Sequence, residues 1–331
     1  MLFAHQLVLK SPFVGKPYSS NFEIISTKIY QPELEEVLFQ IKLISIDPYL
    51  RLKMNPNSKN VYDSYLNKKD VINGYAIAQV IDSSVSTYKI GSNYVGIFPF
   101  QEFLTVNPTG LNIRLINESE FPLSYYLGIL GMPGFSAYVG MKLIKQTAEN
   151  SIFISSAAGT VGSLAGQMAK RQGYTVYGST RSPSKISHLK RLGFDKVFLA
   201  NEFPNIDTDS LRFNILFENV GRSSINQLSK HLNKGGQIII SGLIEQYNEP
   251  SPGSAIDNFN FLTSRQIKVS TFLISNHAHL WDNYFKYITP LLKKNQIRYH
   301  ENVISDFQYL PRALNDLLEG KYIGKLVIKL D

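Results

Sequence analysis

The sequence predicts an α/β fold in which a doubly wound parallel sheet is joined to a separate β-rich domain. From residue 150 onward, short apolar runs alternate with helical segments, which is the pattern of βαβ units. Before residue 120, short runs of β character are separated by turn residues at close intervals, which is typical of a barrel or a sandwich. The length of 331 residues also suits two domains of ordinary size.

The β-rich part contains two clear strand candidates, at residues 36–46 (EVLFQIKLISI) and 74–81 (GYAIAQVI). Both are rich in β-branched and aromatic residues and lie next to turn dipeptides. Two helical segments follow, at 124–130 and 134–144, and a Gly-Met-Pro-Gly sequence separates them. We expect these two helices to lead into the parallel sheet.

Short apolar runs supply the strands that we expect in the parallel sheet, and they are Ser151–Ser155, Tyr174–Ser179, Asp195–Leu199, Phe213–Glu218, Gly236–Ser241 and Ile267–Ile274. Helices at 162–172 and 184–192 connect the first three strands. Further along lie a helix at 310–319 and a strand at 324–330. We expect this late strand to return to the β-rich domain, which would make the parallel sheet an insertion.

The composition narrows the possible chemistry. The chain has no cysteine, which excludes disulfides, thiolate nucleophiles and cysteine-based zinc sites, and we expect no metal. The formal net charge is +8, but the basic residues form no dense tract with interleaved aromatics, so we expect no nucleic-acid partner. No segment approaches the roughly 20 apolar residues that a membrane span needs, and no secretory signal is evident. We therefore expect a cytoplasmic protein with no membrane partner.

The segment 155–162 (SSAAGTVG) follows the first strand of the parallel sheet and opens its first helix. It matches the dinucleotide-binding fingerprint of a Rossmann fold, with Ala157 at the first glycine position. Gly159 would let backbone N–H groups approach a pyrophosphate, and Gly162 would let the helix lie close to the strand. A simple tight turn is the alternative. The intact order of strand, turn, helix and strand favours a dinucleotide site.

The end of the second strand predicts which dinucleotide is bound. An acidic residue there would bind the ribose 2′-hydroxyl of NAD, but no Asp or Glu stands at this point. Thr180, Arg181 and Lys185 stand there instead, and hydroxyl, guanidinium and ammonium groups suit a 2′-phosphate. An ordinary solvated basic loop is the alternative. Together with the missing acid, these residues favour NADP over NAD.

Several motifs point in one direction, and they are 45–51 (SIDPYLR), 130–138 (LGMPGFSAY), 156–163 (SAAGTVGS), 218–221 (ENVG), 240–248 (ISGLIEQYN) and the pair Gly324-Lys325. In order and spacing they resemble the zinc-free branch of the medium-chain dehydrogenases/reductases. This branch contains prostaglandin reductases, leukotriene hydroxydehydrogenases and plant alkenal double-bond reductases. The resemblance covers nearly the whole chain.

The resemblance implies a GroES-like β-barrel domain at 1–122 and 300–331 and a Rossmann NADP-binding domain at 123–299. It also implies a homodimer through the Rossmann edge strand, for which Ile267–Ile274 is the candidate. The implied activity is hydride transfer from NADPH to the activated C=C bond of α,β-unsaturated ketones and aldehydes. Three alternatives stay open: an NADPH quinone oxidoreductase of the same fold, a nucleotide-binding relative without catalysis, and a zinc alcohol dehydrogenase, which the missing cysteines make remote.

The resemblance also assigns residue roles. Tyr247 would reach the substrate carbonyl, and Tyr49 would line the substrate pocket. A phenol with a pKa of about 10 is protonated at neutral pH, so Tyr247 could donate a hydrogen bond where enolate charge develops. The residues expected to contact the cofactor are Met132, Gly134, Ala157, Gly159, Thr160, Val161, Gly162, Thr180, Arg181, Lys185, Asn219, Phe272, Leu273 and Ile274.

Three positions depart from the family pattern. Ala200 stands where the family often has a tyrosine, Arg222 replaces a glycine, and Tyr322 replaces an asparagine. These departures put the affinity for the cofactor and the contacts of the last strand in doubt. They leave Gly159 and Tyr247 untouched.

Overall fold

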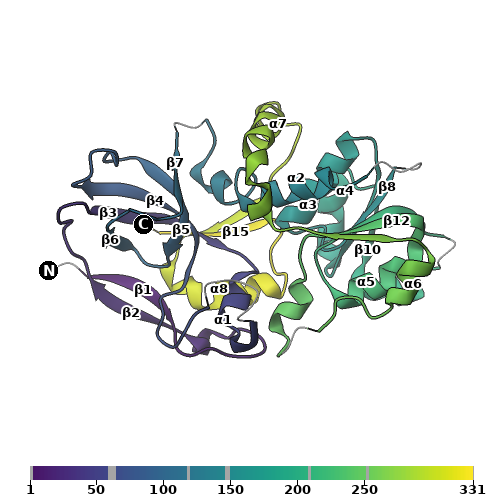
Figure 1. Ribbon diagram of the computed structural model, residues 1–331, viewed down its shortest axis with the longest axis horizontal. Helices are drawn as coiled ribbons and strands as arrows, with labels where there is room; N and C mark the ends of the chain where they lie inside the picture. Colours follow the sequence, from purple (N-terminus) through teal and green to yellow (C-terminus); the bar gives the residue numbers. More distant parts are fainter. Residues whose placement is uncertain are drawn as a thin grey trace.

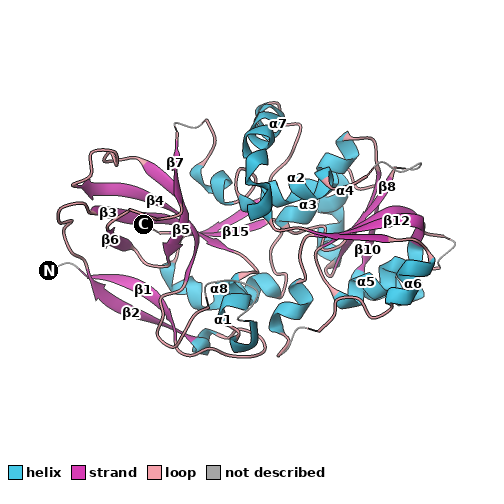
Figure 2. Cartoon of the chain, in the orientation of Figure 1, coloured by secondary structure: helices cyan, strands magenta, loops and turns pink. Residues whose placement is uncertain are grey.

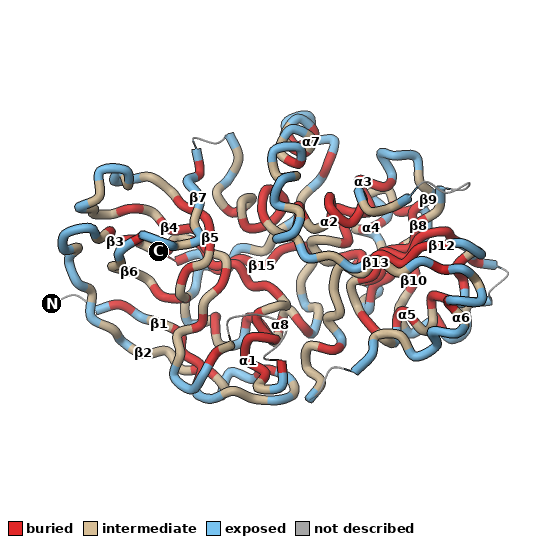
Figure 3. Tube along the Cα trace, in the orientation of Figure 1, coloured by how far each residue is buried: buried red, intermediate tan, exposed pale blue. Residues whose placement is uncertain are grey.

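The structure is a computed structural model, and it describes residues 3–58, 65–117, 120–145, 150–207, 210–250 and 253–330. The chain forms an elongated molecule with two lobes, each built around its own sheet (Figure 1). Buried backbone follows the strands of both sheets, and it continues through the region between the lobes (Figure 3). None of the described helices is long and apolar enough to cross a membrane.

The second lobe contains a parallel sheet with the strand order β10-β9-β8-β11-β12-β13. Its strands are β8 (Ser151–Ile154), β9 (Thr175–Thr180), β10 (Lys196–Leu199), β11 (Phe213–Glu218), β12 (Leu232–Ile240) and β13 (Lys268–Thr271). Every neighbouring pair of these strands is parallel. This is the strand order of a Rossmann fold, and the order reverses between β8 and β11. The predicted doubly wound sheet is confirmed.

Helices cover both faces of the parallel sheet because its central strands are apolar on both sides (Figure 2). In β8, Ile152 and Ile154 pack on one face, while Phe153 packs on the other. The first face is covered by α2 (Met132–Lys142), α3 (Thr160–Arg171), α4 (Ile186–Arg191) and α7 (Trp281–Lys293). The second face is covered by α5 (Arg222–Leu228) and α6 (Phe259–Ser264).

The first lobe contains a largely antiparallel sheet with the order β14-β15-β3-β4-β5-β7, in which β6 also pairs with β3. Its strands are β3 (Val37–Ile46), β4 (Asn73–Ser83), β5 (Asn93–Pro99), β6 (Phe103–Val106), β7 (Ile113–Ile116), β14 (Glu301–Ile304) and β15 (Lys325–Lys329). A separate pair joins β1 (Phe3–Leu9) to β2 (Phe22–Lys28). The short helices α1 (Leu50–Met54) and α8 (Leu310–Leu318) pack against the core of this lobe.

The late strand returns to the first lobe, as we expected. β15 pairs antiparallel with β3 and parallel with β14. The α/β class, with a Rossmann sheet beside a β-rich domain, is therefore confirmed. The residue limits of the two domains stay a prediction.

Several elements differ from the expectations. The predicted helix at 124–130 is a single 3₁₀ turn at Leu123–Leu127, because the backbone leaves the helical region at Gly128 (φ −131°, ψ −101°). The predicted strand at 267–274 ends at Thr271, so its last three residues lie in a loop and in the turn that follows. Four of the described helices were not predicted, namely α1, α5, α6 and α7.

Candidate active site

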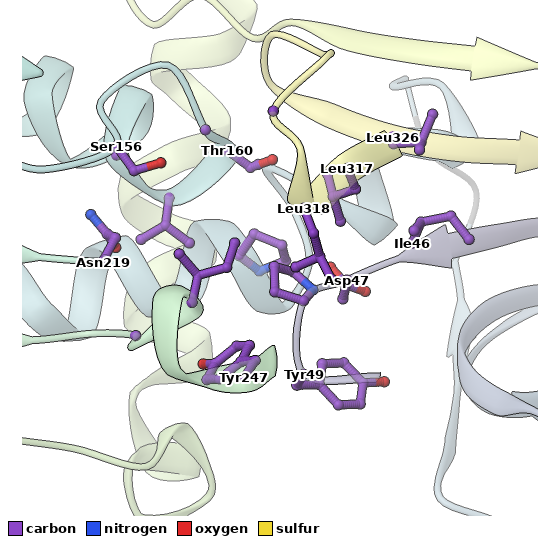
Figure 4. A pocket seen from close by; sticks show the side chains of 18 of the residues that line it. Ile46, Asp47, Tyr49, Ser156, Thr160, Asn219, Tyr247, Leu317, Leu318 and Leu326 are labelled. Carbon is purple, nitrogen blue, oxygen red and sulfur yellow. The ribbon is translucent and has the colours of Figure 1, made fainter. Parts of the chain in front are cut away.

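A large cavity lies between the two lobes, and residues of both lobes line it (Figure 4). Its volume is about 1390 Å³. One wall is formed by the loops that follow β8, β9, β11 and β12, at the point where the strand order reverses. Ligands bind at this point in folds of this type. The opposite wall comes from the start of α1 and from the segment that joins α8 to β15.

The glycine-rich turn forms the part of the wall where α3 begins. Gly159 is the N-cap of α3, and it has no side chain to satisfy the free N–H groups of the first turn. A Cβ atom on Gly162 would lie 2.7 Å from the carbonyl oxygen of Ser156, so only glycine lets the helix come this close to the turn. Exposed N–H groups at the start of a helix favour an anion. These residues fit the pyrophosphate of a dinucleotide.

A buried carboxylate holds the neighbouring loop in place. The Oε1 atom of Glu218 accepts hydrogen bonds from Ser155 Oγ (2.9 Å) and from the backbone N–H groups of Val220 (2.5 Å) and Gly221 (2.9 Å). Its Oε2 atom accepts one from Ser224 Oγ (2.9 Å). Burial raises the pKa of Glu218 to about 7, although each of these hydrogen bonds acts to lower it.

This network fixes Asn219 beside the glycine-rich turn. The backbone N–H of Asn219 donates to Ser155 Oγ (2.7 Å), and its side-chain Nδ2 donates to the Ser155 carbonyl (2.8 Å). Asn219 therefore lies at the cavity wall near Ser156 (Figure 4). The sequence motif included Glu218, but its supporting role becomes visible only when Ser155 and Ser224 are seen around it.

The basic residues after β9 reach across to the first lobe. Thr180, Arg181 and Lys185 all line the cavity. Arg181 donates to the backbone carbonyl of Leu318 (2.8 Å), the last residue of α8. Lys185 donates to two carbonyls of the segment that follows, those of Gly320 (2.6 Å) and Tyr322 (2.5 Å). Burial, and to a lesser degree the charge of Arg181, lower the pKa of Lys185. A phosphate group placed here would meet two cations.

Two tyrosines that are far apart in the sequence line the same end of the cavity (Figure 4). Tyr49 is the N-cap of α1, and Tyr247 lies in a 3₁₀ turn at Ile244–Asn248. Burial raises the pKa of Tyr247 above its ordinary value of 10, although a backbone hydrogen bond from Leu243 opposes this. The phenol is thus held in its protonated form, in which it can donate a hydrogen bond.

Hydrogen bonds between the lobes hold these tyrosines near each other. The Nδ2 atom of Asn55 donates to the Glu249 carbonyl (3.1 Å), and the Nδ2 atom of Asn57 donates to the Pro250 carbonyl (2.6 Å). The segment that carries Tyr247 is therefore attached to the segment around α1.

A buried ion pair forms part of the cavity wall in the first lobe. Lys325 Nζ lies 2.6 Å from Asp47 Oδ1 and donates to the Ile46 carbonyl (2.7 Å), while Ser45 Oγ donates to the Asp47 carboxylate. Burial lowers the pKa of Lys325, and the charge of Asp47 acts to raise it. The sequence interpretation missed this pair. A lysine at the start of β15, directly before its apolar run, was the available signal.

Comparisons with known proteins give the family. A family model of the N-terminal domain of oxidoreductases matches residues 5–113, and one of zinc-binding dehydrogenases matches residues 160–293. The 2-alkenal reductase (NADP(+)-dependent) of Nicotiana tabacum is 32% identical over 98% of this chain and 96% of that protein. The (+)-pulegone reductase of Mentha piperita is 30% identical over 99% of this chain and 98% of that protein.

A solved structure agrees with these relatives. The crystal structure of CurA in complex with NADPH from Vibrio vulnificus superposes with a TM-score of 0.88, at 30% identity over 99% of both chains. This chain belongs to the zinc-free branch of the medium-chain dehydrogenases/reductases. The resemblance stated from the motifs is confirmed.

One of the matching family models describes zinc-binding dehydrogenases. This raises the question of whether this medium-chain reductase has side chains that could bind zinc. Within the described ranges, no group of three or more His, Asp or Glu side chains could hold a metal ion. The whole chain lacks the cysteine ligands that zinc sites commonly use.

The cavity brings together most of the residues that the sequence assigned to this medium-chain reductase. Lining residues from the predicted set are Tyr49, Met132, Gly159, Thr160, Val161, Gly162, Thr180, Arg181, Lys185, Asn219, Tyr247, Leu273 and Ile274. Gly134, Ala157 and Phe272 are not among them. Gly134 and Ala157 are buried in the helix-covered core, and Phe272 packs against that core. The roles of all these residues stay predictions.

The three departures from the family pattern lie in different places. Ala200 and Tyr322 line the cavity. Arg222 points elsewhere, because its Nε donates to the Ser254 carbonyl (2.8 Å) and lies 3.4 Å from Asp257. Only the first two departures can act directly on a bound ligand.

Proposed function

We propose that this chain uses NADPH to reduce the activated C=C bond of α,β-unsaturated ketones and aldehydes. One observation carries the proposal: a single cavity joins the glycine-rich turn and the cations Arg181 and Lys185 to the phenol of Tyr247. The tobacco relative is named for 2-alkenals and NADP, and the peppermint relative for pulegone. The Vibrio structure holds NADPH.

Each part of the cavity has a task in this reaction. The start of α3 and the turn around Gly159 hold the pyrophosphate, and Arg181 and Lys185 bind the 2′-phosphate. Bound NADPH would supply the hydride that the β-carbon of the substrate receives, and a proton taken up at the α-carbon would complete the reduction. The hydroxyl of Tyr247 donates a hydrogen bond to the carbonyl oxygen, where negative charge builds up as the enolate forms. Tyr49 lines the space beside it.

The variant Tyr247→Phe tests the proposed donor. Removing one such hydrogen bond costs about 3 kcal/mol of transition-state stabilisation, so we expect kcat on 2-alkenals to fall by roughly 100-fold. NADPH binding, followed by the fluorescence of the cofactor, should not change. Tyr18→Phe is the matched control, because Tyr18 is an exposed tyrosine outside the cavity lining.

Two outcomes would count against the proposal. Unchanged turnover of Tyr247→Phe with intact NADPH binding would remove Tyr247 from the mechanism. Faster NADPH oxidation with quinones than with any enone or enal would favour a quinone oxidoreductase instead.

We also propose that two copies associate through β13. This strand lies at the edge of the parallel sheet, and one of its sides has no neighbouring strand among the described residues. A size-exclusion profile with monomer alone would contradict the homodimer. The cytoplasmic location stays a prediction from the sequence.

A further inference from the structure

The cavity has a second basic region, which the proposed mechanism does not use. Lys16 and Lys53 line the cavity from the first lobe, together with Val71 and Asn73. Lys53 lies on α1, one helical turn from Tyr49, so both side chains lie on the same side of this helix. This region is therefore close to the tyrosines that we assign to the substrate.

The loop that carries Lys16 is fixed against α1. Arg51 is fully buried, and its guanidinium donates to the carbonyls of Phe13 (3.1 Å) and Gly15 (2.7 and 2.9 Å). The same guanidinium lies over the Phe13 ring at 4.4 Å from its centre. Lys16 directly follows the loop segment that Arg51 fixes by these hydrogen bonds. The basic region therefore keeps its shape without a bound ligand.

Lys53 is a buried cation that has no carboxylate partner among the residues that the structure describes. Only 5% of the surface of Lys53 is exposed. Its Nζ donates to two neutral acceptors of Asn73, the backbone carbonyl oxygen (3.3 Å) and the side-chain Oδ1 atom. Within the described part of the chain, no carboxylate lies within 4.0 Å of Lys53. Burial lowers the pKa of Lys53 to about 8. An ammonium in this position is short of negative charge.

The acidic residues of the cavity wall are engaged elsewhere. Asp47 is paired with Lys325 at 2.6 Å. Glu245 accepts a hydrogen bond from the backbone N–H of Ser223 (3.0 Å). Glu319 lies 3.4 Å from the ammonium group of Lys321. None of these three acidic side chains is therefore paired with Lys16 or Lys53, and the described lining residues Val71 and Asn73 are neutral.

We propose that Lys53, assisted by Lys16, binds a carboxylate on the part of the substrate remote from the C=C bond. The preferred substrates are then enones or enals with an acidic chain end rather than wholly apolar ones. A carboxylate would give the Lys53 ammonium a counter-charge that none of the described side chains supplies within 4.0 Å. This inference rests on the proposed function, because it assumes that the C=C bond is reduced near Tyr247.

The test compares 2-alkenals that end in a carboxylate with their methyl esters, in a series with different numbers of methylenes in the chain. We expect kcat/KM for the acid to exceed that for the ester by about tenfold at the best chain length, mainly through KM. The ratio is taken within each enzyme, so a general loss of activity cancels. In Lys53→Met the ratio should fall to about one, and in Lys53→Arg most of it should return.

Two further variants keep the result clear. Lys89→Met removes an exposed lysine outside the cavity lining, and it should keep the ratio of the wild type. Lys16→Met changes an exposed residue and should lower the ratio in part, so it gives an answer even if Lys53→Met fails to fold. A wild-type ratio of one, or an unchanged ratio in both Lys53→Met and Lys16→Met, would overturn the carboxylate site. Failure to reduce any 2-alkenal, neutral or acidic, would overturn the proposed function itself and the carboxylate site with it.

Discussion

The buried carboxyl group of Glu218 predicts a pH-dependent stability that the variant Glu218→Gln should remove. Glu218 is fully buried, and its two oxygens accept hydrogen bonds from Ser155, Ser224 and two backbone N–H groups. The side chain of glutamine has nearly the same shape as that of glutamate, but it carries no charge. Its Oε1 would keep the acceptor role, and its Nε2 would donate to Ser224 Oγ, because a hydroxyl group can turn to accept.

The size and sign of the effect follow from the pKa. Burial raises the pKa of Glu218 from 4.5 to about 7 in the folded state. Between these values the folded protein holds a proton that the unfolded chain releases, so a rise in pH favours unfolding. At about 1.4 kcal/mol per pH unit, the contribution of Glu218 is roughly 3 kcal/mol. It is fully present below pH 4.5 and is lost as the pH rises through about 7.

Urea unfolding of the wild type and of Glu218→Gln between pH 4.5 and 8 measures this contribution. The free energy of unfolding of the wild type should fall relative to that of the variant by roughly 3 kcal/mol across this range. Burial lowers the pKa values of His188 and His231, but both proteins contain these histidines, so their effects cancel. Glu120→Gln, which removes an exposed carboxyl, should follow the wild type. Parallel curves for the wild type and Glu218→Gln would refute the reasoning.

Two further variants test the wall of the cavity. Lys325→Met leaves Asp47 buried without its partner, so it should lower the free energy of unfolding by about 3–5 kcal/mol, and an unchanged urea midpoint would contradict the buried pair. Gly162→Ala places a Cβ 2.7 Å from the Ser156 carbonyl oxygen and pushes α3 away from the turn. We expect NADPH to bind about tenfold more weakly in a fluorescence titration, and unchanged binding would show that the turn can adjust.

The parallel sheet could be predicted from the sequence because its signals are local. Its central strands are short apolar runs, and the glycine-rich turn stands directly between β8 and α3. Helix α7 was missed because Pro290 lies inside it, and proline reads as a break in a helical pattern. Tyr284, Ile288 and Leu291 recur at helical spacing in α7 and are buried against the sheet. Their packing keeps the segment helical despite the proline.

The sequence predicted residues of the site only where they belong to a recognisable motif. The glycine-rich turn and Tyr247 stand in recognisable segments, and the cavity contains both. The polar contacts across the lobes have no such signal, because their partners are far apart in the chain. Lys325 and Asp47 are separated by 278 residues, and Arg181 donates to a carbonyl that lies 137 residues away. Only the folded chain shows that Lys53 has no carboxylate neighbour in the part that the structure describes.

The place of β15 beside β3 has a consequence for how the protein is made. Ile46 and Lys325, which meet in the first sheet, are 279 residues apart in the chain. A ribosome releases β3 early, and it completes every strand of the parallel sheet before it reaches β15. The second lobe can therefore fold during synthesis, before β15 is available to pair with the half of β3 from Leu43 to Ile46. Although the other edge of β3 can pair with β4 early, the edge that faces β15 stays open for most of the synthesis, and this is the stage at which a chaperone would protect it from aggregation.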